Sequence, residues 1–255
     1  MRAHLELLTL AALSFCLLAL AHASAHAGGF RDGQRTVSRY RDAEARALEP
    51  LTADFRAVGA AWPPKGLYLR AFKLEGVVEL WAAPQRGERW VPVRTFDICM
   101  PSGGLVPKLQ EGDLQVPEGF YEVQSFNPHS NYHLGLMVSY PNATDRARAA
   151  AQHVPPGGGI MIHGKCVTIG CLPLRDGPIE ALYVATVHAR DNGVGKLPVH
   201  IYPCRFETEM CRNTLVQMPE HADFWAGLAA VDAQFRATGK PPNPATVVKA
   251  HAGGA

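Results

Sequence analysis

One stretch of the chain combines residue types that can perform nucleophilic catalysis. It covers residues 160–171 and reads IMIHGKCVTIGC. A thiolate that attacks an amide needs a base within hydrogen-bond reach and backbone N–H donors aimed at the developing oxyanion. Gly170 beside Cys171 can supply such donors, because a residue without a Cβ lets a substrate carbonyl approach the peptide N–H groups. His163 is the nearest candidate base.

The same residues admit two other interpretations. His163, Cys166 and Cys171 could be three zinc ligands, although a tetrahedral site usually has two close ligand pairs and no clear fourth ligand lies nearby. Alternatively, Cys166 and Cys171 could form a local disulfide, with His163 an ordinary strand residue. Spacing alone leaves these alternatives and a cysteine nucleophile open.

The elements that must position these residues are short strands. Such strands, separated by Gly, Pro, Asn and Asp, predict a mainly β fold, a sandwich or a barrel. Residues of strand type recur in seven runs: 67–73, 77–82, 90–98, 120–126, 134–140, 159–163 and 197–202.

Helical patterns flank the strands. Residues 28–64 form a predicted N-terminal helical segment, in which Pro50 interrupts an Ala-, Arg- and Glu-rich run. A further helix is predicted over 179–190, after Asp176-Gly177-Pro178. Apolar residues at helical spacing between Phe224 and Phe235 predict a C-terminal helical extension over 207–240. The tail, 241–255, begins with two prolines and is predicted to be disordered.

The first 27 residues have the pattern of an export signal. Arg2 and His4 precede an apolar run over 7–21, and two Ala-x-Ala cleavage patterns follow. The run is shorter than the roughly 20 residues that a membrane-spanning helix needs. We therefore expect residues 1–27 to be a signal peptide that is removed on export.

Composition and cysteine number narrow the function classes. A formal net charge of +2 is too small for nucleic-acid binding driven by charge alone, so we exclude nucleic acid as a partner. Of the six cysteines, Cys16 lies in the expected signal peptide. Five then remain in an oxidising compartment, where cysteines tend to pair, so an odd number implies a free thiol or an intermolecular bridge.

The motifs resemble those of the L,D-transpeptidase (YkuD-like) family, which remodels bacterial peptidoglycan. His163-Gly164 followed by Thr168-Ile169-Gly170-Cys171 looks like the family's histidine and Ser/Thr-x-Gly-Cys signature. Residues 102–121, SGGLVPKLQEGDLQVPEGFY, resemble the block that the family places upstream of its catalytic loop. The resemblance covers about 67–206. It is nearest to the branch that contains murein amidases releasing peptidoglycan-bound lipoprotein.

The resemblance implies a YkuD-like β-sandwich catalytic domain over 65–206 and cysteine-dependent acyl transfer on peptidoglycan stem peptides. Cys171 would be the nucleophile, His163 the base, and the N–H groups of Gly170 and Cys171 the oxyanion donors, with Thr168 shaping the loop and lining the substrate site. No cofactor or metal is expected. The protein would act in the periplasm or cell envelope, as an amidase on attached lipoprotein, as a transpeptidase, or as a non-catalytic wall-binding module.

Two further expectations follow from the resemblance. The family's arginine two residues after the cysteine is replaced by Pro173, so Arg175 is the nearest cation that could bind a substrate carboxylate; the alternative is a solvated loop residue. If Cys171 must stay free, two bridges can form among the other four cysteines. We expect Cys204–Cys211 as the local pair, which leaves Cys99–Cys166.

Overall fold

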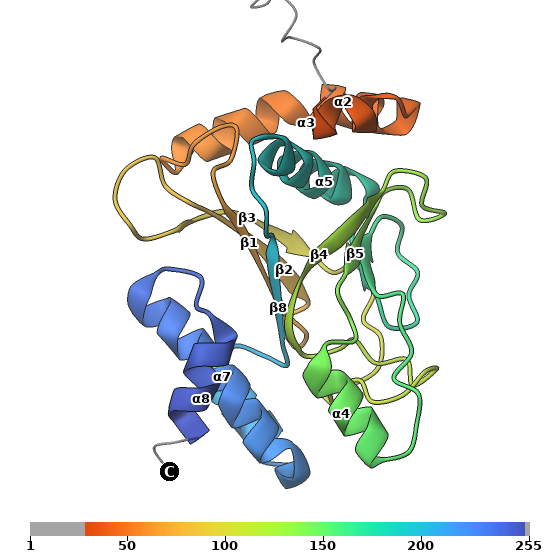
Figure 1. The fold of residues 1–255 in the computed structure, drawn as a ribbon, viewed down its shortest axis with the longest axis vertical. Coiled ribbons are helices and arrows are strands. Elements are labelled where there is room, and N and C mark those ends of the chain that lie inside the picture. The colour runs from red at the N-terminus through yellow and green to blue at the C-terminus, as the bar shows by residue number, and fades with distance from the viewer. Residues whose placement is uncertain (1–28, 253–255) are drawn as a thin grey trace, which may run out of the picture.

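The computed structural model describes residues 29–252, so the expected signal peptide lies outside the described residues. Its centre is a curled eight-stranded sheet with the order β3-β2-β1-β8-β4-β5-β6-β7 (Figure 1). The strands are β1 (Leu67–Phe72), β2 (Val77–Ala82), β3 (Val91–Asp97), β4 (Gly119–Asn127), β5 (Gly135–Val138), β6 (Met161–His163), β7 (Leu172–Pro173) and β8 (Pro198–Tyr202). The seven predicted strands are all present, and the two-residue β7 is an addition.

Strand β4 joins the two halves of the sheet. Its first residues pair with β8 and its last residues with β5, and the register shifts between Val123 and Ser125. The halves of the predicted sandwich are therefore continuous parts of one curled sheet. The fold class expected from the sequence, a β-sheet domain flanked by N-terminal and C-terminal helices, is confirmed.

Helices lie on both sides of the sheet. In Figure 1, α2, α3 and α5 lie on one side, and α7 and α8 lie on the other. The helices are α2 (Phe30–Arg35), α3 (Ser38–Ala57), α4 (Ala143–Ala151), α5 (Asp176–Asp191), α6 (Glu209–Leu215), α7 (Ala222–Thr238) and α8 (Pro244–Ala252), with a 3-10 turn over Pro219–His221. None of these helices in the described part of the chain is long and apolar enough to cross a membrane.

Helix α5 is buried around its whole circumference, because α3 covers the side that faces away from the sheet. Every residue from Ile179 to Ala189 is buried. Helix α3 presents a stripe that includes Tyr40, Leu51 and Phe55. Pro50 does not divide this run into two helices, because α3 continues through it. The proline lies on the exposed face and removes one helical N–H, while the buried stripe holds the turns on either side of it.

The prediction of a disordered tail is also wrong over Pro244–Ala252, which forms α8 and packs on α7. Ala245 and Val248 line a hollow of about 470 Å³ together with Phe224 and Leu228 of α7. This apolar contact gives a short segment a surface to fold against. The segment itself is too short to show a helical period.

A buried arginine connects the sheet to α7. Arg70 lies in the middle of β1, where its guanidinium pairs with Glu79 of β2 and with the fully buried Asp232 of α7. The rings of Phe72 and Phe235 lie 4.9 and 4.6 Å from the guanidinium carbon. A buried charge is stable only when it is paired and hydrogen-bonded, so this contact fixes where α7 packs.

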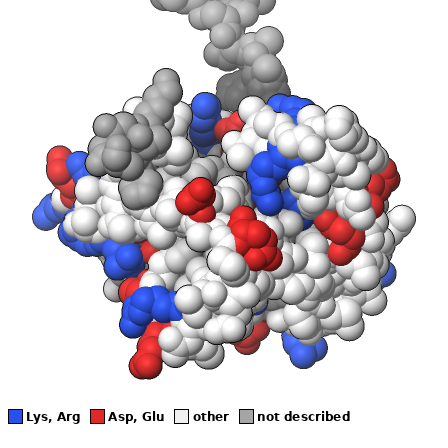
Figure 2. All heavy atoms as spheres, turned by 90° about the horizontal axis from the view of Figure 1, so that it is seen from below, with Lys and Arg blue, Asp and Glu red and all other residues white. Residues whose placement is uncertain are grey.

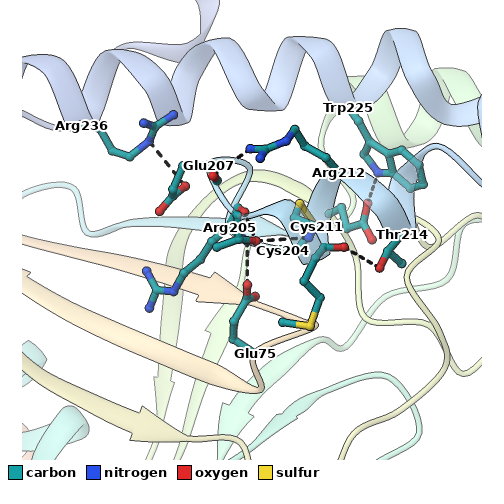
Figure 3. The surroundings of a disulfide bond; sticks show 12 residues. Glu75, Cys204, Arg205, Glu207, Cys211, Arg212, Thr214, Trp225 and Arg236 are labelled. Atoms are coloured by element: carbon teal, nitrogen blue, oxygen red, sulfur yellow. Dashed lines mark hydrogen bonds and ion pairs between the residues drawn. A yellow bond between two sulfur atoms is a disulfide. The ribbon is translucent and has the colours of Figure 1, made fainter.

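A disulfide supports the same region. Cys204, just after β8, is bonded to Cys211 of α6 (Figure 3). Beside it, Trp225 of α7 donates its indole N–H to Glu118 at 2.7 Å. The C-terminal helices are thus attached to the sheet by covalent, ionic and hydrogen-bonded contacts.

The charged surface has no single-sign region on the face drawn in Figure 2. Lys and Arg side chains alternate there with Asp and Glu, and uncharged residues separate them. That face therefore offers a polyanion no continuous basic track.

Asp232→Ala is expected to lower the free energy of unfolding by about 3 kcal/mol, because it leaves the buried Arg70 with one partner fewer. Denaturant unfolding followed by circular dichroism measures the loss. Asp223→Ala removes an exposed carboxylate from the same helix and should cost less than about 1 kcal/mol. Equal losses in the two variants would contradict the anchoring role of Asp232.

Candidate active site

The pairing of β6 with β7 brings the sequence-predicted Cys171 and His163 together. The two strands are parallel, with Ile162 opposite Leu172 and His163 opposite Pro173. Paired residues of parallel strands point to the same face, and faces alternate along a strand. Cys171 therefore lies beside Met161, on the face toward which His163 also points.

The Cys171 thiol is free and half-buried. It accepts the Met161 N–H at 3.4 Å and contacts the Gly159 carbonyl at 3.7 Å. Burial raises the pKa of the thiol, while the Met161 N–H and the charge of Lys108 act in the opposite direction. Burial therefore favours the neutral thiol over the thiolate.

The His163 imidazole is only 1% exposed. Its Nδ1 lies 2.6 Å from the Gly164 carbonyl oxygen, which can only accept, so Nδ1 carries the proton and Nε2 keeps its lone pair. Burial lowers the pKa of His163 below the ordinary 6.5, against the effect of the Gly164 carbonyl. A neutral imidazole with a free lone pair is the form that a general base requires.

Thr168 forms the turn that precedes the thiol. Its Oγ1 accepts the N–H groups of Gly170 and Cys171 at 3.2 and 2.8 Å, and it donates to the Cys171 carbonyl at 2.9 Å. Thr168 thus shapes the loop. The two N–H groups that the resemblance gives as oxyanion donors are both bonded to this hydroxyl.

A steric constraint explains why position 170 is a glycine. Its φ is 131°, and a Cβ there would meet the Gln115 carbonyl oxygen at 3.0 Å. The catalytic loop therefore packs closely on the segment that contains Gln115. A larger residue would push the two apart.

An ion pair organises the segment 108–115, which packs against the loop that contains Gly170. Lys108, which is 6% exposed, donates to Asp113 at 2.6 Å and to the Gln110 carbonyl at 2.8 Å. Asp113 also accepts the N–H of Gln115, whose carbonyl approaches Gly170. Lys108 belongs to the block recognised in the sequence, but no role was predicted for it.

The disulfide pattern decides between the interpretations left open by spacing. Cys99 is bonded to Cys166, which excludes a Cys166–Cys171 bridge and removes Cys166 as a zinc ligand. Among the described residues, no three His, Cys, Asp or Glu side chains are grouped so that they could hold a metal ion. The Cys99 N–H also donates to the Pro173 carbonyl at 3.0 Å, so the bridge attaches the catalytic loop beside β7.

Arg175 is exposed at the N-terminal end of α5. It lines a hollow of about 350 Å³ with residues of β3 and the start of α5, and neither Cys171 nor His163 lines that hollow. This position gives no support for contact with a substrate at Cys171.

Two further side chains make contacts beside the candidate site. Tyr132 stacks on His163, with ring centroids 4.6 Å apart and planes tilted by 35°. His133 lies 2.8 Å from Glu180 of α5 through its Nε2. Neither contact has a signal in local spacing, because the partners are distant in the sequence.

Comparison with known proteins places the chain in a family. No protein-family model matches it. It is 35% identical over 184 residues to the Escherichia coli K12 protein named "Putative L,D-transpeptidase YafK", and the match covers 71% of each chain. The same values hold for the protein of that name in Escherichia coli O157:H7.

Solved structures are less similar. The helical cell shape determining protein Pgp2 of Campylobacter jejuni is 23% identical, with a TM-score of 0.43 over 55% of this chain and 48% of that one. L,D-transpeptidase 1 of Mycobacterium tuberculosis is 14% identical, with a TM-score of 0.29 over 54% of this chain and 62% of that one. On the identity and coverage of its match to YafK, the chain belongs to the L,D-transpeptidase family.

Proposed function

We propose that the protein is a cysteine acyltransferase of peptidoglycan stem peptides, with Cys171 as nucleophile and His163 as base. The observation that carries this proposal is the position of a free thiol on the same sheet face as a buried imidazole whose Nδ1 is tied to Gly164. The proposed catalytic unit is 65–206, with the segments 28–64 and 207–240 packed against it.

The proposed reaction has two steps. Cys171 gives its proton to Nε2 of His163, and its sulfur attacks the carbonyl carbon of a meso-diaminopimelate residue in the stem peptide. The C–N bond breaks, the amine leaves with the proton from His163, and a thioester remains. Water then gives a proton to His163 and adds to the thioester. The C–S bond breaks, the acid is released and the thiol is restored.

The oxyanion donors need a rearrangement in this scheme. The N–H groups of Gly170 and Cys171 can bind the oxyanion if the substrate oxygen displaces or shares the Thr168 hydroxyl. Backbone donors at such a position typically contribute several kcal/mol to the transition state. We propose that Thr168 holds the two amides in place until the substrate arrives.

We favour hydrolysis of a protein-carrying stem peptide over transpeptidation because of the exposed apolar side chains around the thiol. Large apolar side chains are exposed on the loops next to Cys171, and Ile169 is the most exposed of them at 79%. The others are Met100, Leu114 and Val167. A polar stem peptide does not need such a surface, whereas a polypeptide attached to the stem can bury apolar side chains there. The proposed substrate is therefore a stem peptide that carries a lipoprotein.

The proposed compartment is the periplasm or cell envelope. The bonds Cys99–Cys166 and Cys204–Cys211 support this, because disulfides form and persist in oxidising compartments.

Cys171→Ala is expected to abolish turnover and acyl-enzyme formation without loss of the fold, since a small side chain is removed from a loop. Intact-mass analysis after incubation with a muropeptide detects the thioester in the wild type, and thermal unfolding checks the variant. Residual turnover above about a tenth of the wild-type rate would contradict the assignment of the nucleophile. Binding of sacculi by a wild type that forms no adduct would indicate the wall-binding module instead.

The acid limb of the pH profile should lie below pH 6.5, the ordinary pKa of histidine. Burial lowers the pKa of His163, so the base stays neutral on acidification until the pH falls through that lowered value. The rate of acyl-enzyme formation, measured by quenched mass analysis from pH 4.5 to about 8, gives the midpoint. A midpoint above 6.5 would contradict the assignment of the acid limb to a buried His163 with a lowered pKa.

Ile169→Ser should slow the release of lipoprotein about tenfold, because burial of an isoleucine contributes roughly 1.5 to 3 kcal/mol. Sacculi with and without bound lipoprotein are incubated with the enzyme, and the released protein and muropeptides are analysed. Val216→Ser, which changes another strongly exposed β-branched residue at the end of α6, is the control. New stem-to-stem cross-links without release would favour the transpeptidase.

A further inference from the structure

The loop over residues 128–133, between β4 and β5, lies against the candidate base. Strand β5 begins with Gly135 opposite His163, and the Gly164 N–H donates to the Leu134 carbonyl at 3.1 Å. The stacking of Tyr132 on His163 therefore comes from the last part of this loop. Because Tyr132 is 38% exposed and His163 only 1%, the tyrosine ring covers part of the imidazole.

Helix α3 holds this loop in place. Arg39 donates through Nη1 to the carbonyls of Ser130 and His133 at 2.7 and 2.6 Å, with the Pro128 carbonyl at 3.4 Å. The loop has no regular structure, so these carbonyls need donors from elsewhere. A charged donor forms stronger hydrogen bonds than a neutral one, so Arg39 fixes the path of the loop.

A second contact from α3 supports the first. Arg46 forms two hydrogen bonds with Glu180 of α5, at 2.9 and 2.6 Å. Glu180 in turn lies 2.8 Å from Nε2 of His133. The residue that follows Tyr132 is therefore bound on its carbonyl by Arg39 and on its side chain by Glu180.

We propose that Tyr132 is a positioning residue for the His163 imidazole, and that Arg39 of the N-terminal helix α3 sets Tyr132 through the backbone of the 128–133 loop. The proposal rests on the proposed function, in which His163 is the base. In this proposal the N-terminal segment helps to set the geometry of the active site, although Arg39 touches neither the thiol nor the base.

The physical reason is that the Gly164 carbonyl fixes the imidazole along one edge only. A ring held at one edge can still tilt, and the stacked tyrosine limits the tilt from its face. A displacement of about 1 Å in a catalytic group can reduce the rate by up to about a hundredfold. The same ring keeps water from the imidazole, and access of water stabilises the charged form.

Several charged or titratable groups surround His163. The thiol of Cys171 comes from the loop before β7. Lys165 donates its ammonium to the Asn131 carbonyl at 2.8 Å, and its N–H donates to Asp176 at 2.9 Å. The pair of His133 and Glu180 lies on the side of α5. None of these side chains is itself replaced in the Tyr132 and Arg39 variants.

The test compares two matched pairs of variants in the full chain. Tyr132→Ala removes the stacked ring and Tyr132→Phe keeps it. Arg39→Met removes the donor to the loop. Arg41→Met removes an arginine of the same helix that donates instead to the carbonyls of Arg35 and Thr36, outside the loop.

Two readouts are measured for each variant. The first is the pKa of His163 from an NMR titration of histidine-labelled protein, with His163→Gln to assign its signal. The second is the rate of acyl-enzyme formation with a muropeptide. Tyr132→Ala and Arg39→Met should raise the pKa of His163 toward 6.5 and slow acylation about tenfold or more. Tyr132→Phe and Arg41→Met should match the wild type.

The outcomes separate the two proposals. If Tyr132→Ala equals Tyr132→Phe in both readouts, the positioning role is wrong. If Arg39→Met equals Arg41→Met while Tyr132→Ala is impaired, the part assigned to Arg39 is wrong. If the wild type forms no acyl-enzyme, the proposed function fails, and the titration still tests whether Tyr132 controls the environment of His163. Thermal unfolding shows whether the Arg39→Met variant is folded. If it is not, the comparison of Tyr132→Ala with Tyr132→Phe decides whether Tyr132 has the positioning role.

Discussion

The parallel ladder between β6 and β7 is only two residue pairs long, and the position of the Cys171 thiol depends on it. So short a ladder has little stability of its own. Contacts on both sides support it: the Leu174 N–H donates to the His163 carbonyl at 2.7 Å, and the Cys99 N–H donates to Pro173. The Cys99–Cys166 disulfide then attaches the loop that carries the thiol to the segment that follows β3. The positions of Cys171 and His163 are thus fixed by the hydrogen bonds and the disulfide around these two strands.

The segment between β3 and β4 is organised by buried ammonium groups instead of secondary structure. Lys73 donates to the carbonyls of Val106 and Val116 at 2.8 and 3.1 Å and to Glu118 at 2.8 Å. Burial lowers the pKa of Lys73, and the pairing with Glu118 opposes that effect. Lys108 fulfils the same function nearer the thiol. Backbone carbonyls outside helices and strands need donors, and these side chains provide them.

The sequence predicted the parts of the structure that have a local period or a local motif. The seven longer strands and the buried stripe of α7 are visible as patterns of apolar residues. Spacing left the roles of Cys171 and His163 open, and the family resemblance made them the candidates. Strand β7 was missed because two residues cannot show a period. Helix α4 was missed because ATDRARAAA carries no apolar side chain larger than alanine. Its buried Asp145 instead forms a capping box with Asn142.

Contacts between residues far apart in sequence could not be predicted, because they depend on how the chain folds and leave no local pattern. Thr168 accepts the two amide protons only because the loop turns back on itself, which spacing does not reveal. The bonds of Arg39 to the 128–133 loop cross about 90 residues of sequence. Nothing in the neighbourhood of Arg39 distinguishes it from the other arginines of α3.

These long sequence separations also set an order of events during synthesis. Helix α3 leaves the ribosome before any of its partners in α5 or the 128–133 loop exists, and the bond from Arg46 to Glu180 spans 134 residues. Until then its apolar stripe has no surface to cover, and an isolated helix of 20 residues gains little from its own hydrogen bonds. This early segment is therefore among the last to reach its final contacts. Contacts between residues so far apart in sequence slow folding, because the long intervening chain must be closed before they form.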